Sequence, residues 1–99
     1  MTKQVTLTVN REPIQLDYYV NEFVYYIAGA ITGSLRNTGE IKDLKIEACK
    51  GRVTIDLNGQ NVSLKEFPML IITSTLEGML KHLKGVNGKP EDIVITVNQ

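Results

Sequence analysis

The dipeptide Asn58-Gly59, set between two runs of alternating apolar and polar residues, constrains the fold of this chain more than any other feature. Asn-Gly is the preferred sequence of the two-residue turn that joins antiparallel strands. A turn at this point keeps the apolar side chains on one face of the hairpin. The predicted opposing pairs are Leu57 with Gln60, Ile55 with Val62, and Val53 with Leu64.

A second turn at Lys50-Gly51 extends this hairpin into a three-stranded meander. The run Ile41 to Ala48 alternates in the same way and forms the preceding strand, so that Val53 to Leu57 becomes the central strand of the meander. The predicted pairs across the new turn are Ala48 with Val53, Ile46 with Ile55, and Leu44 with Leu57.

The remaining segments predict a hairpin, two helices and a last strand. Alternation at Val5, Leu7 and Val9, and again at Ile14 and Leu16, predicts an N-terminal hairpin with its turn at Asn10-Arg11. A helix-periodic run follows from Tyr18 to Arg36 and ends around Asn37-Thr38-Gly39. A second helix begins near Pro68 and runs to Lys84. After a loop from Gly85 to Pro90, the last alternating strand contains Ile93, Ile95 and Val97.

The chain also contains a candidate internal repeat with an offset of 48 residues. The segment VTLTVNREPIQLD at 5–17 aligns without a gap over VTIDLNGQNVSLK at 53–65, with asparagine at both turns. We therefore predict a single α+β domain over residues 1–99, built from two β-β-α-β repeats at about 3–50 and 51–99 and related by a pseudo-two-fold axis. Its six antiparallel strands would carry both helices on the same side. The repeat further predicts that Asp92 to Val97 pairs with the first hairpin and that neither half is stable alone.

The opening hairpin and helix, with the segment VNREPIQL, resemble the start of ubiquitin-like and sulfur-carrier β-grasp domains over about the first third of the chain. Carriers of that family need a C-terminal Gly-Gly pair for adenylation, whereas this sequence ends in Val97-Asn98-Gln99. The duplication also departs from that fold. We therefore expect that the carrier function does not transfer.

Composition argues against several classes of function. Eleven basic and eleven acidic residues give a formal net charge of zero, and the strands lack the aromatic residues of RNA-binding sheets, so a nucleic-acid partner is not expected. Cys49 is the single cysteine and cannot form an internal disulfide. The N-terminus does not read as a signal peptide, and the apolar run from Val24 to Thr32 is too short to cross a bilayer. We expect a cytoplasmic protein without a membrane partner.

The sequence contains no recognisable catalytic constellation, so we expect a non-enzymatic protein without a metal or a cofactor. His82 is the only histidine, and its helical position predicts a partly buried residue near the inward stripe of the second helix. Gly29 and Gly33 fall inside a helix and do not fit a phosphate-binding loop.

The first helix has an outer face that its counterpart in the repeat does not share. A helical wheel centred on Ile27 predicts a core stripe of Val20, Phe23, Val24, Ile31, Ser34 and Leu35, with Tyr25 and Gly29 pointing away. Tyr26, Glu22 and Gly33 flank that outer face. The second helix has Thr73, Ser74, Glu77 and Lys81 at the positions of Tyr25, Tyr26, Gly29 and Gly33, and Glu66 at that of Tyr18. Tyr19 matches Phe67, which predicts a core or staple role.

These features lead to a hypothesis of function with two alternatives. The protein would be an interaction or assembly module that forms a homodimer, or binds another protein, through the outer face of the first helix: Tyr18, Glu22, Tyr25, Tyr26, Gly29 and Gly33. The first alternative is a ligand-binding or enzymatic domain with a pocket near Tyr19, Tyr26 and His82. The second is that the tyrosines have no role and the helix is simply exposed.

Overall fold

The computed structural model of the chain describes residues 4–35, 42–62, 64–83, 86 and 90–98, without the side chains of residues 33–35 and 67. The described residues form two helices and six strands. In chain order these are β1 (Gln4–Val9), β2 (Glu12–Pro13), α1 (Tyr18–Leu35), β3 (Asp43–Cys49), β4 (Arg52–Leu57), β5 (Gln60–Val62), α2 (Glu66–Leu80) and β6 (Asp92–Asn98). The predicted α+β class is confirmed.

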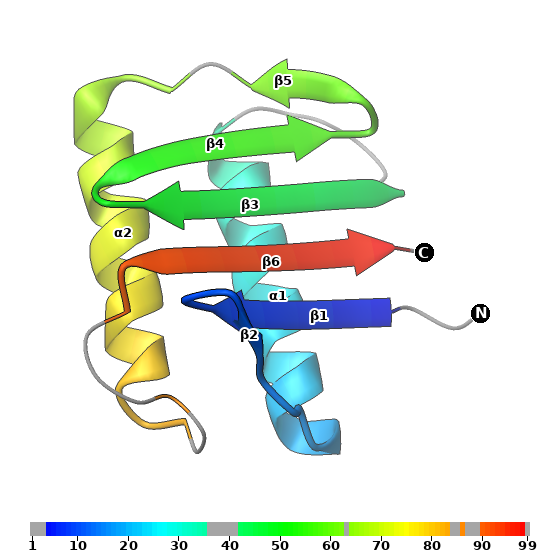
Figure 1. The fold of residues 1–99 in the computed structure, drawn as a ribbon. Coiled ribbons are helices and arrows are strands. Elements are labelled where there is room, and N and C mark those ends of the chain that lie inside the picture. The colour runs from blue at the N-terminus through cyan, green and yellow to red at the C-terminus, as the bar shows by residue number, and fades with distance from the viewer. Residues whose placement is uncertain (1–3, 36–41, 63, 84–85, 87–89, 99) are drawn as a thin grey trace.

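The strands form one open antiparallel sheet in the order β2-β1-β6-β3-β4-β5. Each of the neighbouring pairs runs antiparallel. Both helices lie on the same side of this sheet and cross its strands, and they run in opposite directions (Figure 1). The molecule is therefore a two-layer slab, with principal extents of 35 × 34 × 18 Å.

The core lies between the helices and one face of the sheet. Because successive side chains of a strand point to opposite faces, β3, β4 and β6 alternate between buried apolar and more exposed residues. One buried row crosses five strands through paired positions: Leu7, Ile95, Ile46, Ile55 and Val62. The helices close over it with Val24, Ala28, Thr32, Ile72, Leu76 and Leu80.

Three two-residue turns set the register of the sheet. The turn residues Asn10-Arg11, Lys50-Gly51 and Asn58-Gly59 all have positive φ, from 50° to 85°. Two consecutive residues with positive φ define the type I′ turn, whose twist matches that of antiparallel strands. The predicted pairs Ala48–Val53, Ile46–Ile55, Leu44–Leu57, Ile55–Val62 and Leu57–Gln60 are confirmed.

The two turn asparagines make the same hydrogen bonds at opposite ends of the sheet. The backbone N–H of Asn58 donates to the carbonyl of Asp43 at 2.7 Å, and its Oδ1 accepts from the N–H groups of Lys42 and Asp43 at 2.9 Å. The N–H of Asn10 donates to the carbonyl of Asp92 at 2.7 Å, and its Oδ1 accepts from Glu91 and Asp92 at 2.9 and 3.0 Å. Each asparagine thus fixes the start of the strand that lies beside its own hairpin: Asn58 fixes β3, and Asn10 fixes β6.

The two halves of the chain exchange their last strands. β3, from the first half, pairs with β4, and β6, from the second half, pairs with β1. This is the pairing that the repeat hypothesis requires. Burial also agrees at the offset of 48 residues, because Val24 and Ile72 are both buried while Phe23 and Ile71 are both exposed. The repeat and its pseudo-two-fold axis stay predictions.

Several element boundaries differ from the sequence-based expectation. β2 has only two residues, and β5 ends at Val62, so the predicted pair of Val53 with Leu64 does not form. α2 begins at Glu66, which leaves Pro68 in the first turn, where no backbone N–H is needed. It ends at Leu80 and not at Lys84. The predicted end of the first helix around 37–39 and most of the loop 85–90 lie outside the described residues.

Loss of the Asn58 side chain should destabilise the fold. Asn58→Ala removes the acceptor of two backbone N–H groups and places alanine at a φ of 51°, which together should lower the free energy of unfolding by about 2–3 kcal/mol. Asn58→Gly tolerates the φ and should cost only about 1 kcal/mol. Urea denaturation measures both, with Asn61→Ala as control. Asn10→Ala should cost as much as Asn58→Ala, and unequal costs would contradict the equivalence of the two turns.

Separate halves of the chain should not fold. The fragments 1–50 and 51–99 each leave their last strand without the partner strand from the other half, so each should lack a cooperative thermal transition by circular dichroism. Mixing the two fragments should restore the spectrum of the intact chain. A fragment that unfolds cooperatively on its own would refute this prediction.

Candidate interaction surface on the helix layer

α1 faces the sheet with a stripe different from the predicted one. Its buried residues are Val24, Ala28 and Thr32, spaced four apart, which centres the inner face on Ala28 and not on Ile27. The Thr32 hydroxyl donates to the carbonyl of Ala28 at 2.9 Å, which satisfies this polar group inside the core. One residue of shift corresponds to a rotation of 100° about the helix axis.

This rotation corrects three of the sequence-based predictions. Phe23, expected in the core, is 45% exposed, and Tyr19, expected in a core or staple role, is 76% exposed. Tyr25, expected to point away from the sheet, is half-buried and packs against the core. Apolar residues occupy nearly the whole circumference of α1, so periodicity alone did not fix which side would contact the sheet. The small residues Ala28 and Thr32 decide it, since they let the helix backbone approach the strands.

The other predicted interface residues divide between exposed and half-buried positions. Tyr18 and Tyr26 are 82% and 64% exposed, whereas Glu22 and Gly29 are half-buried. A Cβ atom built at Gly29 would meet no other part of the fold within 4 Å, so close packing within the chain does not account for this glycine. Gly33 lies within α1, and its surroundings are outside the description.

The outer face of α1 carries an apolar stripe at helical spacing. Tyr19, Phe23, Tyr26 and Ala30 are all exposed and follow one another at intervals of four, three and four residues, which places them on one side of the helix. We call these four residues the aromatic stripe. Its rings are partly fixed from below, because the half-buried Tyr25 packs edge-on against Tyr26 with centroids 5.2 Å apart. The only charged residue in α1 is Glu22.

α2 contributes a second exposed apolar pair that the sequence analysis missed. Leu70 and Ile71 are 56% and 51% exposed, while the adjacent Ile72 is buried. The signal was available in the sequence, because three consecutive large apolar residues on a helix are separated by 100° each and cannot all face one sheet. The N-terminal half of α2 therefore also presents large apolar side chains to solvent.

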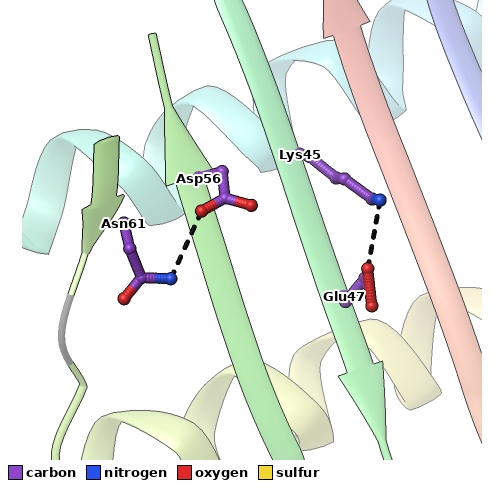
Figure 2. Close-up of polar contacts among 4 residues, drawn as sticks. All are labelled: Lys45, Glu47, Asp56 and Asn61. Carbon is purple, nitrogen blue, oxygen red and sulfur yellow. Dashed lines mark hydrogen bonds and ion pairs between the residues drawn. The ribbon is translucent and has the colours of Figure 1, made fainter. Parts of the chain in front are cut away.

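Charged side chains gather on the opposite, open face of the sheet. Figure 2 shows Lys45 and Glu47 of β3 in an ion pair at 3.2 Å, and Asn61 of β5 donating to Asp56 of β4 at 3.3 Å. Lys45 and Asp56 are cross-strand neighbours, as predicted, although the ion pair of Lys45 forms within its own strand. This partition of charge to the sheet and apolar residues to the helices makes the two faces of the slab chemically different.

His82 and the two tyrosines of the predicted pocket do not come together. His82 lies beyond the end of α2 and is exposed, which contradicts its placement on the inward stripe. It lines a cavity of about 690 Å³ whose other lining residues are Pro13, Ile14, Gln15, Leu16, Asp17, Val20 and Leu83. Asp17 caps α1 at the edge of this cavity, since its Oδ1 accepts the Val20 N–H at 2.9 Å. Neither Tyr19 nor Tyr26 lines it.

A smaller cavity of about 340 Å³ lies where α2 passes the Lys50-Gly51 turn and the start of β6, with Glu77, Glu91 and Thr73 in its lining. Among the described residues, the buried Thr73 hydroxyl has no hydrogen-bond partner. No three His, Cys, Asp or Glu side chains of the described part are grouped as metal binding requires. Cys49 is a free, exposed thiol. None of the described helices has the length and apolarity needed to span a bilayer.

Comparison of the chain with models of protein families, with curated proteins and with solved structures finds no match.

Proposed function

We propose that this protein is a non-enzymatic interaction or assembly module that binds protein through the outer face of its helix layer. The observation that carries the proposal is the aromatic stripe, in which Tyr19, Phe23 and Tyr26 are 76%, 45% and 64% exposed. A helix that is apolar on all sides is normally buried on all sides. In a two-layer fold the sheet covers only the inner side of α1, so the outer side needs a second protein surface.

The composition of the stripe supports recognition of a protein. Tyrosine and phenylalanine are enriched at the centres of protein interfaces, where charged residues are depleted. Full burial of one large apolar side chain contributes about 1.5–3 kcal/mol. The three aromatic residues of the stripe are therefore able to supply much of the free energy of a specific complex, even after part of it is lost to ordering of the two partners.

The distribution of charge supports the helix side over the sheet side. The open face of the sheet carries Lys45, Glu47, Arg52 and Asp56, which are ordinary solvent-facing residues of a strand. On the helix side, α1 carries only Glu22, which is half-buried, and α2 carries Glu66 at its start and the half-buried Glu77, with Lys81 directly after its end. A partner that covers the helices would therefore displace water from apolar side chains without stripping it from many charges.

Ligand binding is a second candidate because of the cavity beside His82. Its volume, about 690 Å³, is within the range of small-molecule sites, and its lining combines apolar Ile14, Leu16 and Val20 with polar Asp17 and His82. This candidate differs from the one raised by the sequence, since it uses His82 without Tyr19 and Tyr26.

Replacement of an exposed tyrosine by a charge should abolish binding and leave the fold intact. Tyr26→Glu introduces an unpaired charge at the centre of the aromatic stripe, and we expect a loss of about 2 kcal/mol or more of binding free energy. The free energy of unfolding should fall by only about 1 kcal/mol, because the position is on the surface and the main loss is the edge-on contact with Tyr25. Sedimentation velocity of the purified protein and retention of partner proteins on the immobilised protein measure the binding.

Thr54→Glu, on the open face of the sheet, is the matched control and should keep every interaction of the original chain. If the original protein is monomeric and retains no protein that Tyr26→Glu fails to retain, the proposed function is wrong.

The cavity candidate makes a separate prediction. In a fragment screen followed by two-dimensional NMR, ligands of the cavity should shift the signals of Val20, His82 and Leu83 together. Val20→Trp should fill part of the space and abolish these shifts, whereas Tyr26→Glu should keep them. A screen in which no fragment shifts these three signals would eliminate this candidate.

A further inference from the structure

The large exposed apolar side chains are confined to one half of each helix. In the described part of the chain they are Tyr18, Tyr19, Phe23, Tyr26, Leu70 and Ile71. The first four lie in the first nine residues of α1, and the other two in the first six residues of α2. Each helix therefore has a bulky N-terminal half on its outer side.

The described side chains that are exposed in the C-terminal half of each helix are small. Among them, α1 has Ala30 beyond Tyr26, and α2 has Ser74, Thr75 and Gly78 beyond Ile71. A Cβ built at Gly78 meets nothing within 4 Å, so its small size is not required by packing within the chain. Because α1 and α2 run in opposite directions, the bulky halves lie at diagonally opposite corners of the layer (Figure 1).

This pattern fits a second copy of the same surface. We propose that the partner of the helix layer is a second copy of this chain, packed face to face about a two-fold axis with α1 antiparallel to α1. This inference rests on the proposed function. An axis across the helices places the bulky half of each helix over the flat half of the same helix in the second copy, and the two copies then contribute the same patch, which makes the interface isologous. Parallel packing would set bulky half against bulky half and leave the flat halves apart.

The aromatic stripe defines the register of this pairing. With the axis passing between residues 24 and 25, Tyr19 lies opposite Ala30 of the second copy, and Phe23 lies opposite Tyr26 of the second copy. In both pairs the axis lies midway between the two residue numbers, so one register pairs all four residues of the aromatic stripe. A large ring is then set against a methyl group at each end, and two aromatic pairs occupy the centre, where edge-to-face contact is favourable.

Charge at the ends of α2 agrees with the same arrangement. Glu66 opens α2, and Lys81 follows its last residue, and both are exposed. Antiparallel packing of α2 on α2 turns the end of one copy that carries Glu66 toward the end of the other copy that carries Lys81. Such pairs at the rim favour the antiparallel orientation, whereas a parallel orientation would bring like charges together.

The available surface corresponds to a small dimer interface. Helices of 18 and 15 residues are about 27 and 22 Å long, and each presents a strip about 10 Å wide. The layer thus offers a projected area on the order of 500 Å², whereas each partner in a standard interface buries roughly 800 Å² of accessible surface, so the dimer would be at the small end of the known range.

Exchanging the large and the small residue at the two ends of the aromatic stripe, Tyr19 and Ala30, tests this pairing. Sedimentation equilibrium should show a dimer for the original chain, and both Ala30→Tyr and Tyr19→Ala should raise its dissociation constant roughly 30-fold or more, by collision and by loss of contact respectively. The double variant Tyr19→Ala/Ala30→Tyr exchanges the large and small residues, so it should recover the original dissociation constant to within about fivefold. Thr54→Tyr, on the sheet, should leave the dissociation constant unchanged.

The possible outcomes separate this inference from the proposed function. Recovery in the double variant supports the antiparallel pairing, since a contact of α1 with α2 or with another protein would not be rescued. A dimer without recovery overturns the pairing. A chain that stays monomeric up to near-millimolar concentration overturns the second copy as occupant, and the proposed function then stands only if the immobilised chain retains a protein that Tyr26→Glu loses. Thermal melts of all variants check that they are folded.

Discussion

The rest of this structure depends on one constraint, which is that two helices must cover one face of a six-stranded sheet. Six strands spaced about 4.8 Å apart make a sheet roughly 29 Å wide, and helices of 18 and 15 residues that cross the strands extend about 27 and 22 Å over that width. Each helix is only about 10 Å in diameter, so both must lie side by side on the same face to cover the length of the strands. The buried row from Leu7 to Val62 needs that cover across five strands. The described residues form no third layer, so the sides of α1 and α2 that face away from the sheet are surface.

The strands and their register could be predicted from the sequence because local signals decide them. Asn58-Gly59 and Lys50-Gly51 favour the positive φ values that the turns adopt, and with strict alternation on either side only one register buries the apolar residues. The pairing of β6 with β1 was predicted from the sequence alignment of the two halves of the chain. A similarity between two short segments thus predicted a contact between distant parts of the chain. The end of β5 was missed because the alternation continues to Leu64 beyond the last ladder pair.

The candidate site was predicted only in part, because the rotation of α1 is decided by packing and not by periodicity. With apolar residues around the helix, an inner face centred on Ile27 or on Ala28 fits the pattern, and the sheet selects Ala28 because a short side chain permits a close approach. Tyr18 and Tyr26 are exposed on the outer side. Phe23, predicted in the core, is exposed, and Tyr25, predicted to point away from the sheet, is half-buried. The exposure of Leu70 and Ile71 was not predicted, because Thr73, Ser74, Glu77 and Lys81 indicate an ordinary solvent-facing outer side for the second helix.

The pairing of Gln4 with Asn98 makes the chain of this domain nearly a ring. Its first and last described residues, Gln4 and Asn98, lie side by side on the adjacent strands β1 and β6 (Figure 1). If the two ends were joined and the chain were opened at another loop, every helix and strand could keep its place, which is the condition for circular permutation. Anything attached at either end would leave from the level of the sheet, so two attached segments would start as neighbours while the outer side of the helices stayed accessible.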